Sequence, residues 1–160
     1  MKKFLEFAGF CALGLAVVGL ILMMATPAVV TKDADALLKG TEAIFGGQNF
    51  DPVILGLLAW IFGLLGILVL GAVVVLPLLK IKALDKFAGV LNLVAVGALV
   101  TAGILVFFTE PAFGAANEWS EEAIKAWTLG GGYVAAGILS IIGGAVAILP
   151  AAVDFIGKKK

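Results

Sequence analysis

Four long apolar stretches, separated by more polar segments, dominate the pattern of the chain. The stretches cover residues 4–30, 53–79, 87–108 and 128–153. A helix of about 20 residues crosses the roughly 30 Å hydrocarbon core of a bilayer, so each stretch is long enough to span it. Transmembrane β-strands are shorter and alternate in polarity, which these stretches do not. The pattern predicts an all-α membrane protein with a single domain, residues 1–160, folded as an up-down-up-down bundle of four transmembrane helices.

The intervening segments predict how these helices connect. Residues 80–86 form a short connection, which makes the second and third helices antiparallel neighbours. The outer loops, residues 31–52 and 109–127, are too small for separate domains, so we expect them to form a small cap on the bundle. The first loop is expected to be a broken helix or an irregular segment, because glycines interrupt its helical spacing.

Prolines and one serine mark expected breaks. Pro27 and Pro77 are expected to kink the first and second helices near their ends, and Pro111 to end the third helix. Ser120 precedes two acidic residues and is expected to cap a short helix lying at the membrane surface.

The lysines predict the orientation of the bundle. All 11 basic residues are Lys, and eight of them lie at the termini or in the 80–86 connection, whereas Lys32, Lys39 and Lys125 lie in the two longer loops. Because cytoplasmic loops carry an excess of positive residues, we expect a multi-pass protein of the cell membrane with both termini in the cytoplasm. The cap is then extracytoplasmic. Glu6 and Asp154 are expected at the cytoplasmic boundary, which leaves the predicted membrane interior free of charge.

Composition excludes several functions. Apolar residues make up 62% of the chain and charged residues 14%, which excludes a water-soluble domain. The chain has no His, its net charge is zero, and its one cysteine, Cys11, has no partner for an intrachain disulfide. No nucleophile–base pair, metal-ligand cluster or phosphate-binding loop is visible in the sequence. We therefore predict no enzyme activity, no cofactor, no metal and no nucleic-acid partner.

Small residues recur at helical spacing within the apolar stretches, and such faces allow helices to approach closely in lipid. Asn92 is expected to hydrogen-bond across one of these faces. The residues predicted to form helix-packing or partner interfaces are Gly56, Ala59, Gly63, Gly66, Asn92, Gly132, Ala136, Ser140 and Gly144. Three aromatic residues, Trp119, Trp127 and Tyr133, are expected to anchor the bundle at the outer membrane interface.

The first half of the chain resembles small, mostly uncharacterised four-helix membrane proteins of Gram-positive bacteria. The resemblance is carried by the lysine-preceded first helix that ends in Pro27-Ala28 and by the phrase Ile44-Phe45-Gly46 before the second helix. The layout alone is similar to the claudin and peripheral myelin protein tetraspan group. That group carries a Gly-Leu-Trp motif and two Cys in its first outer loop, which has neither Trp nor Cys here, so no functional residue carries over.

Two functions are consistent with this pattern. The first is a non-enzymatic structural or accessory subunit that binds other membrane proteins or copies of itself through its small-residue faces and outer loops. Membrane lipid is a further expected partner. The alternative is a channel or transporter for a small neutral or lipidic solute, with Asn92, Thr101 and Ser140 along the path. Convergence of those three side chains on one cavity would favour transport.

Overall fold

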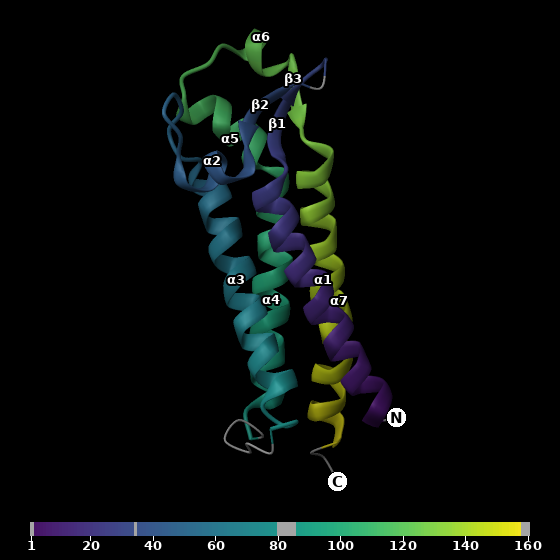
Figure 1. Cartoon of the computed structure of the whole chain (residues 1–160). Helices are drawn as coiled ribbons and strands as arrows, with labels where there is room; N and C mark the ends of the chain where they lie inside the picture. The colour runs from purple at the N-terminus through teal and green to yellow at the C-terminus, as the bar shows by residue number, and fades with distance from the viewer. Residues whose placement is uncertain (1, 34, 80–85, 158–160) are drawn as a thin grey trace.

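Four helices form the body of the protein in the computed structural model (Figure 1). The structure describes residues 2–33, 35–79 and 86–157. Each of the four is long and apolar enough to cross a membrane, which confirms that part of the prediction. They are α1 (Lys2–Ala25), α3 (Ile54–Val75), α4 (Ala88–Phe107) and α7 (Gly131–Gly157).

The helices pack as a ring of neighbours. Helix α4 packs along both α3 and α7, and α1 packs along α7, whereas α1 and α3 touch much less. Both chain termini lie at one end of the bundle, which we call the terminal end (Figure 1). The opposite end, which we call the sheet end, carries three short strands and three short helices.

The first helix is shorter than predicted. It ends at Ala25, not at residue 30, and Pro27 begins the strand β1 (Pro27–Thr31) instead of kinking a helix. Proline lacks a backbone N–H and disfavours helical geometry in the residue before it, here Thr26. The β-branched residues Val29, Val30 and Thr31 then favour a strand.

Strand β1 is the centre of a three-stranded antiparallel sheet in the order β2-β1-β3. The strand β2 (Ala36–Lys39) places Leu38 opposite Val29, and β3 (Trp127–Leu129) places Leu129 opposite the same residue. The sheet was not predicted: residues 31–52 were expected to be a broken helix or irregular, and residues 128–130 to belong to the fourth helix. It joins to each other the two loops that were predicted to be outer loops.

Three short helices complete the sheet end: α2 (Gly40–Phe45), α5 (Thr109–Ala116) and α6 (Glu121–Ile124). The backbone N–H of Lys39 donates to the Glu42 carboxylate at 3.1 Å and so fixes the start of α2. Pro111 does not end a helix as predicted. It lies in the first turn of α5, where its missing N–H breaks no helical hydrogen bond. Ser120 does cap α6, since its hydroxyl accepts from the Ala123 N–H at 3.4 Å.

The ends of α3, α4 and α7 can be compared with the ends of the predicted apolar stretches. Helix α4 agrees with residues 87–108 to within one residue at each end. Helix α3 ends at Val75, two residues before Pro77, so this proline also follows a helix instead of kinking it. Helix α7 begins at Gly131 and contains Pro150. Residues 80–85 of the predicted short connection lie outside the described residues, as do residues 158–160.

Two hydrophobic clusters fill the protein. One joins the sheet end to the adjoining ends of the long helices and includes Leu38, Ile44, Phe113 and Tyr133, all without exposed surface. The other lies between the helices and contains mainly small side chains packed around Leu70 and Leu99. The second cluster lets the helix backbones lie close together, whereas the first holds the short strands against the sheet end of the long helices.

Candidate functional site

The small residues predicted on α3 lie inside the protein. Gly56, Ala59, Gly63 and Gly66 are all buried. A Cβ on Gly66 would lie 2.7 Å from the Leu99 side chain of α4, so this glycine is what allows Leu99 to pack there. This face therefore packs within the chain and is not available to a partner.

The predicted small-residue face of α7 also packs against helices of the same chain. Ala136 and Ser140 face Gly19 of α1, whose added Cβ would lie 3.1 Å from the Ala136 carbonyl oxygen and 3.2 Å from the Ser140 hydroxyl. The Ser140 hydroxyl donates to the Ala136 carbonyl at 2.9 Å, within its own helix. Gly132 faces the Thr26 side chain, and Gly144 lies against α4, where an added Cβ would be 2.8 Å from the Val100 side chain.

One close approach between two of the long helices involves a pair that sequence reasoning missed. A Cβ on Gly103 of α4 would lie 2.6 Å from the carbonyl oxygen of Gly137 on α7. Both residues are glycines inside apolar helices, which is a signal of close helix packing. They were not chosen because neither lies four residues from one of the small residues predicted to form interfaces. Gly97, on the same helix, is exposed with no heavy atom within 4 Å of its added Cβ.

The three polar residues of the alternative solute path are Asn92, Thr101 and Ser140. Ser140 is satisfied by its own helix backbone. Asn92 is 1% exposed, and its side-chain oxygen has no hydrogen-bond partner among the described residues. Neither these two nor Thr101 lines either of the two cavities described below.

The predicted interfacial anchors divide into two groups. Trp119 is exposed and packs edge-on against Trp127, with ring centroids 5.1 Å apart. Trp127 also contacts the buried ring of Phe113 at 5.5 Å. Tyr133 differs from the prediction, because its side chain has no exposed surface and belongs to the core below the sheet. It cannot reach lipid headgroups from that position.

One carboxylate of the sheet end has an altered protonation equilibrium. Burial raises the pKa of Glu110, in the first turn of α5, above its ordinary value. Among the described residues, no three His, Cys, Asp or Glu side chains lie close enough together to hold a metal ion.

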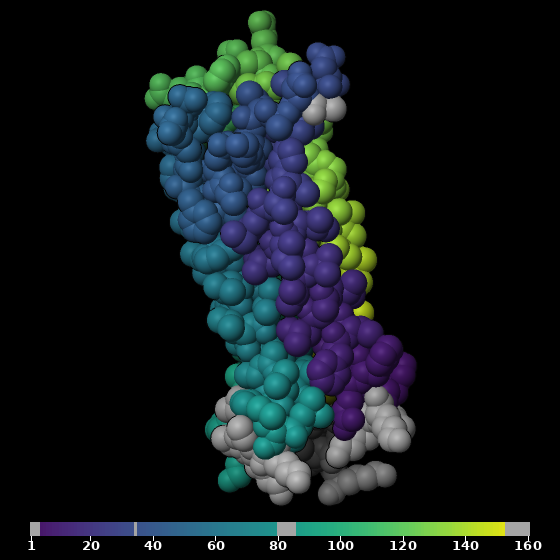
Figure 2. All heavy atoms as spheres, viewed as in Figure 1, coloured from purple at the N-terminus to yellow at the C-terminus, as the bar shows by residue number. Residues whose placement is uncertain are grey.

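A hollow lies between α1 and α3, which contact each other much less than the other neighbouring pairs of long helices do. These helices lie side by side on the face shown in Figure 2. A shallow cavity of about 510 Å³ lies between Leu13 and Val17 of α1 and residues 67–76, at the end of α3. All of its lining side chains are apolar. Its lining residues are Leu13, Val17, Ile67, Leu68, Gly71, Ala72, Val75 and Leu76.

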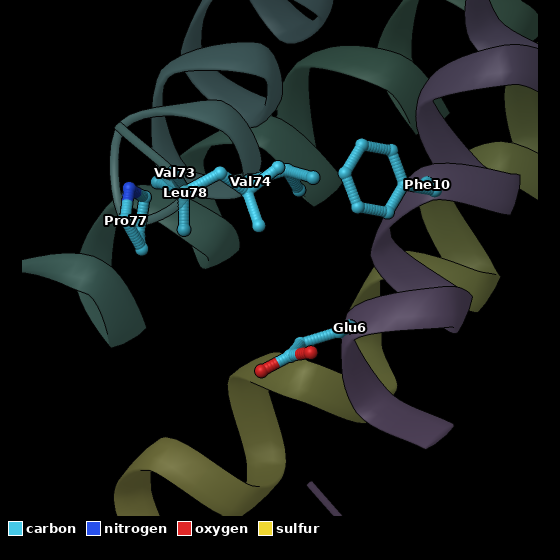
Figure 3. A pocket seen from close by; sticks show the side chains of 6 residues that line it. All are labelled: Glu6, Phe10, Val73, Val74, Pro77 and Leu78. Carbon is cyan, nitrogen blue, oxygen red and sulfur yellow. The ribbon is translucent and has the colours of Figure 1, made fainter. Parts of the chain in front are cut away.

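A second cavity of about 220 Å³ continues this hollow toward the terminal end. Its lining includes Glu6 and Phe10 of α1, Val74 of α3, and Pro77, which follows α3. The Phe10 ring points from α1 toward the side chains of Val74 and Leu78, and the Glu6 carboxylate lies below them in the view (Figure 3). The helices approach closely beside this cavity at Gly9, whose added Cβ would lie 3.0 Å from the side chain of Val74, one of its lining residues. We call the two cavities together the α1–α3 groove.

The groove ends partway along the helices. Closer to the sheet end, Leu20 of α1 packs on Gly63 of α3, where an added Cβ would lie 3.2 Å from the Leu20 side chain. The groove therefore extends along only one half of α1. It is a shallow apolar groove that is open on its side and has one carboxylate, that of Glu6, at its terminal end.

Comparison with protein-family models, with curated proteins and with solved structures gave no match to this chain. The function is accordingly inferred from the geometry.

Proposed function

We propose that the chain is a non-enzymatic accessory protein of the cell membrane that holds a lipid-soluble ligand in the α1–α3 groove. The observation that carries the proposal is the asymmetry of the ring of helices. Three of the four neighbouring pairs are in extensive contact, whereas α1 and α3 leave an apolar hollow. An opening of this kind admits a ligand sideways from the bilayer, since its walls are as apolar as lipid.

The proposal includes the placement of the bundle in the membrane. In this placement the helices run up-down-up-down, the sheet end forms the extracytoplasmic cap, and the terminal end lies in the cytoplasm. The distribution of lysines supports it, since Lys32, Lys39 and Lys125 belong to the sheet end and the other eight to the termini and the 80–86 connection. Labelling of cysteines introduced at Asn49 and Gly157 by an impermeant maleimide, in a Cys11→Ser background, tests this orientation. Labelling of Gly157→Cys from outside intact cells would refute it.

Retention of a bound lipid tests the groove. Gly71 lines the larger cavity, and its added Cβ would have ordinary contact with Leu13 at 3.9 Å, so the Cβ of Gly71→Leu fits and the rest of its side chain extends into the groove. Gly97→Leu makes the same change on an open face of α4. In native mass spectrometry from mild detergent, we expect wild type and Gly97→Leu to retain one lipid per chain and Gly71→Leu to lose it. Equal retention by all three would refute the proposal.

A partner membrane protein, or a second copy of the chain, is the second candidate, and one observation favours it. Gly97 lies on a lipid-facing side of α4 among the exposed side chains of Leu93, Val94 and Ile104. A second helix can approach closely at such a position. Gly97→Leu is then expected to abolish an oligomer or a co-purifying membrane protein that Gly71→Leu leaves intact. A strictly monomeric wild type with no co-purifying protein would contradict this second role.

A further inference from the structure

We infer that the ligand of the α1–α3 groove is a membrane phospholipid held by one hydrocarbon chain in the larger cavity alone, and that the length of this chain, not the headgroup, selects it. This inference rests on the proposed function, because it names the class of ligand for the same groove.

The contacts on either side of the larger cavity limit what can enter it. Toward the terminal end, Gly9 of α1 is in close contact with Val74 of α3. Toward the sheet end, Leu20 of α1 packs on Gly63 of α3. Gly9 and Leu20 are eleven residues apart, which is about 16 Å of helix. A transmembrane helix of a partner is about 10 Å wide and needs about 30 Å to cross the bilayer, so it cannot enter between these two contacts. A single hydrocarbon chain is narrow enough to do so.

The larger cavity opens sideways, toward the surrounding lipid. Three of its lining side chains, Val17, Leu68 and Val75, are exposed on the surface of the bundle. A hydrocarbon chain can pass over this apolar rim without removing a polar group from water. Two further lining residues, Gly71 and Ala72, are small. Larger side chains at these two positions would fill the space that a ligand chain can occupy.

The depth of the cavity fits the chain of a lipid from the leaflet at the terminal end. Leu13 and Val17 follow Glu6, the nearest charged residue on α1, by seven and eleven residues, which is about 10 and 16 Å of helix. One leaflet contributes about half of the roughly 30 Å hydrocarbon core. A lipid chain of that length, beginning near the level of Glu6, therefore reaches the far end of the cavity. A chain half as long ends before the cavity begins.

The lining of the cavity offers nothing that distinguishes one headgroup from another. All eight of the described residues that line it are apolar. The charged residues of α1 lie near the terminal end and have both signs, since Glu6 is acidic and Lys2 and Lys3 are basic. Such a mixture attracts the ammonium groups as well as the phosphate groups of phospholipids. We therefore expect the chain, and not the headgroup, to decide which lipid is retained.

Native mass spectrometry from mild detergent tests the chain length, because it weighs each bound lipid. The protein is offered equal amounts of dioctanoyl- and dipalmitoyl-phosphatidylcholine, which share a headgroup. The lipid that remains on Gly71→Leu reports the preference of the micelle itself. Relative to that variant, we expect wild type and Gly97→Leu to favour the long chain by about tenfold, because the short chain loses its many dispersion contacts with the cavity walls.

The headgroup is tested with lipids that carry identical palmitoyl and oleoyl chains. Phosphatidylcholine, phosphatidylethanolamine and phosphatidylglycerol are offered in equal amounts in the same experiment. We expect wild type to retain the three within about twofold of one another, since no charge-assisted hydrogen bond in the cavity separates them. A larger preference for any one of them would overturn the inference.

These outcomes distinguish the ligand class from the proposed function. If Gly71→Leu loses bound lipid but wild type shows no greater preference for the long chain, the groove remains the ligand site and the assignment to one chain in the larger cavity is wrong. If Gly71→Leu retains lipid as wild type does, both are wrong. Val17→Trp fills the same cavity from α1, and its result replaces that of Gly71→Leu if the latter fails to fold. A photoreactive residue at Leu68 that cross-links a protein in place of lipid would also overturn the inference.

Discussion

The contact between Gly103 and Gly137 offers a sharp test of how the bundle is held together. In Gly103→Ala the new methyl group would lie 2.6 Å from the Gly137 carbonyl oxygen, 0.8 Å short of the 3.4 Å at which ordinary contact begins. The oxygen belongs to a helix backbone and cannot turn away as a flexible side chain does. Helices α4 and α7 must therefore separate locally, although they share one of the most extensive interfaces of the protein.

The expected loss in the free energy of unfolding follows from this separation of the two helices. A gap of 0.5–1 Å removes roughly a quarter to a half of the dispersion energy of the atoms that line it. Overpacking of this kind costs about 1–3 kcal/mol, and we expect the upper part of that range because a backbone atom is involved. Alanine is more favourable than glycine inside a helix by up to about 1 kcal/mol, which offsets part of this loss. The net destabilisation is therefore about 2 kcal/mol, a change of roughly 30-fold in the unfolding equilibrium.

The matched control is Gly97→Ala on the same helix. No heavy atom lies within 4 Å of its added Cβ, so only the gain in helix propensity remains, up to about 1 kcal/mol. Unfolding by sodium dodecyl sulfate in mixed micelles, followed by tryptophan fluorescence, measures both variants against wild type. A Gly103→Ala protein as stable as Gly97→Ala would show that α4 and α7 do not meet at this pair, and the packing described for them would be wrong.

Three other predictions concern single side chains. Asn92→Leu is expected to leave stability unchanged or raise it by about 1 kcal/mol, since the buried amide oxygen has no partner to lose; a clear destabilisation in the same micelle assay would reveal one. Phe113→Ala is expected to cost about 3–5 kcal/mol, because it empties the centre of the sheet-end core, where Phe113 packs edge-on against Phe50 at 5.3 Å; a loss below about 1 kcal/mol in denaturant unfolding would contradict that packing. Glu110 has a pKa raised by burial, so its charged form destabilises the folded state as pH rises above the ordinary value of 4.5. Glu110→Gln should then raise Tm at pH 7 and leave it unchanged well below that value, whereas equal effects at both pH values, or an equal effect of the exposed Glu118→Gln, would refute this reading.

Hydropathy predicted the helices well and the short strands not at all. A membrane-spanning helix is defined by the length of an apolar run, so α4 was placed to within a residue. Residues 27–31 are as apolar as the helix before them, and a hydropathy pattern cannot separate a short strand from the end of a helix. The informative signal was Pro27 followed by β-branched residues, which was interpreted as a kink.

The candidate site was less predictable, because it depends on where two helices do not meet. The small residues that the sequence marks show where backbones approach, and Gly56 to Gly66 are indeed buried. A groove is created by the crossing of α1 over α3, and Leu20, Gly63 and Gly9 set that crossing only in three dimensions. Glu6 was interpreted as a boundary residue, since its position along the chain gives its depth but not the neighbour it faces.

The strand pair β1–β3 has a mechanical consequence for this groove. Only Thr26 separates α1 from β1, and only Gly130 separates β3 from α7, so the ladder between the strands ties these two helices together at one end. Sliding or rotation of α1 against α7 would break the ladder. Helix α1 is therefore held in register with α7 at this end, and the width of the groove depends on where α3 lies relative to this tied pair.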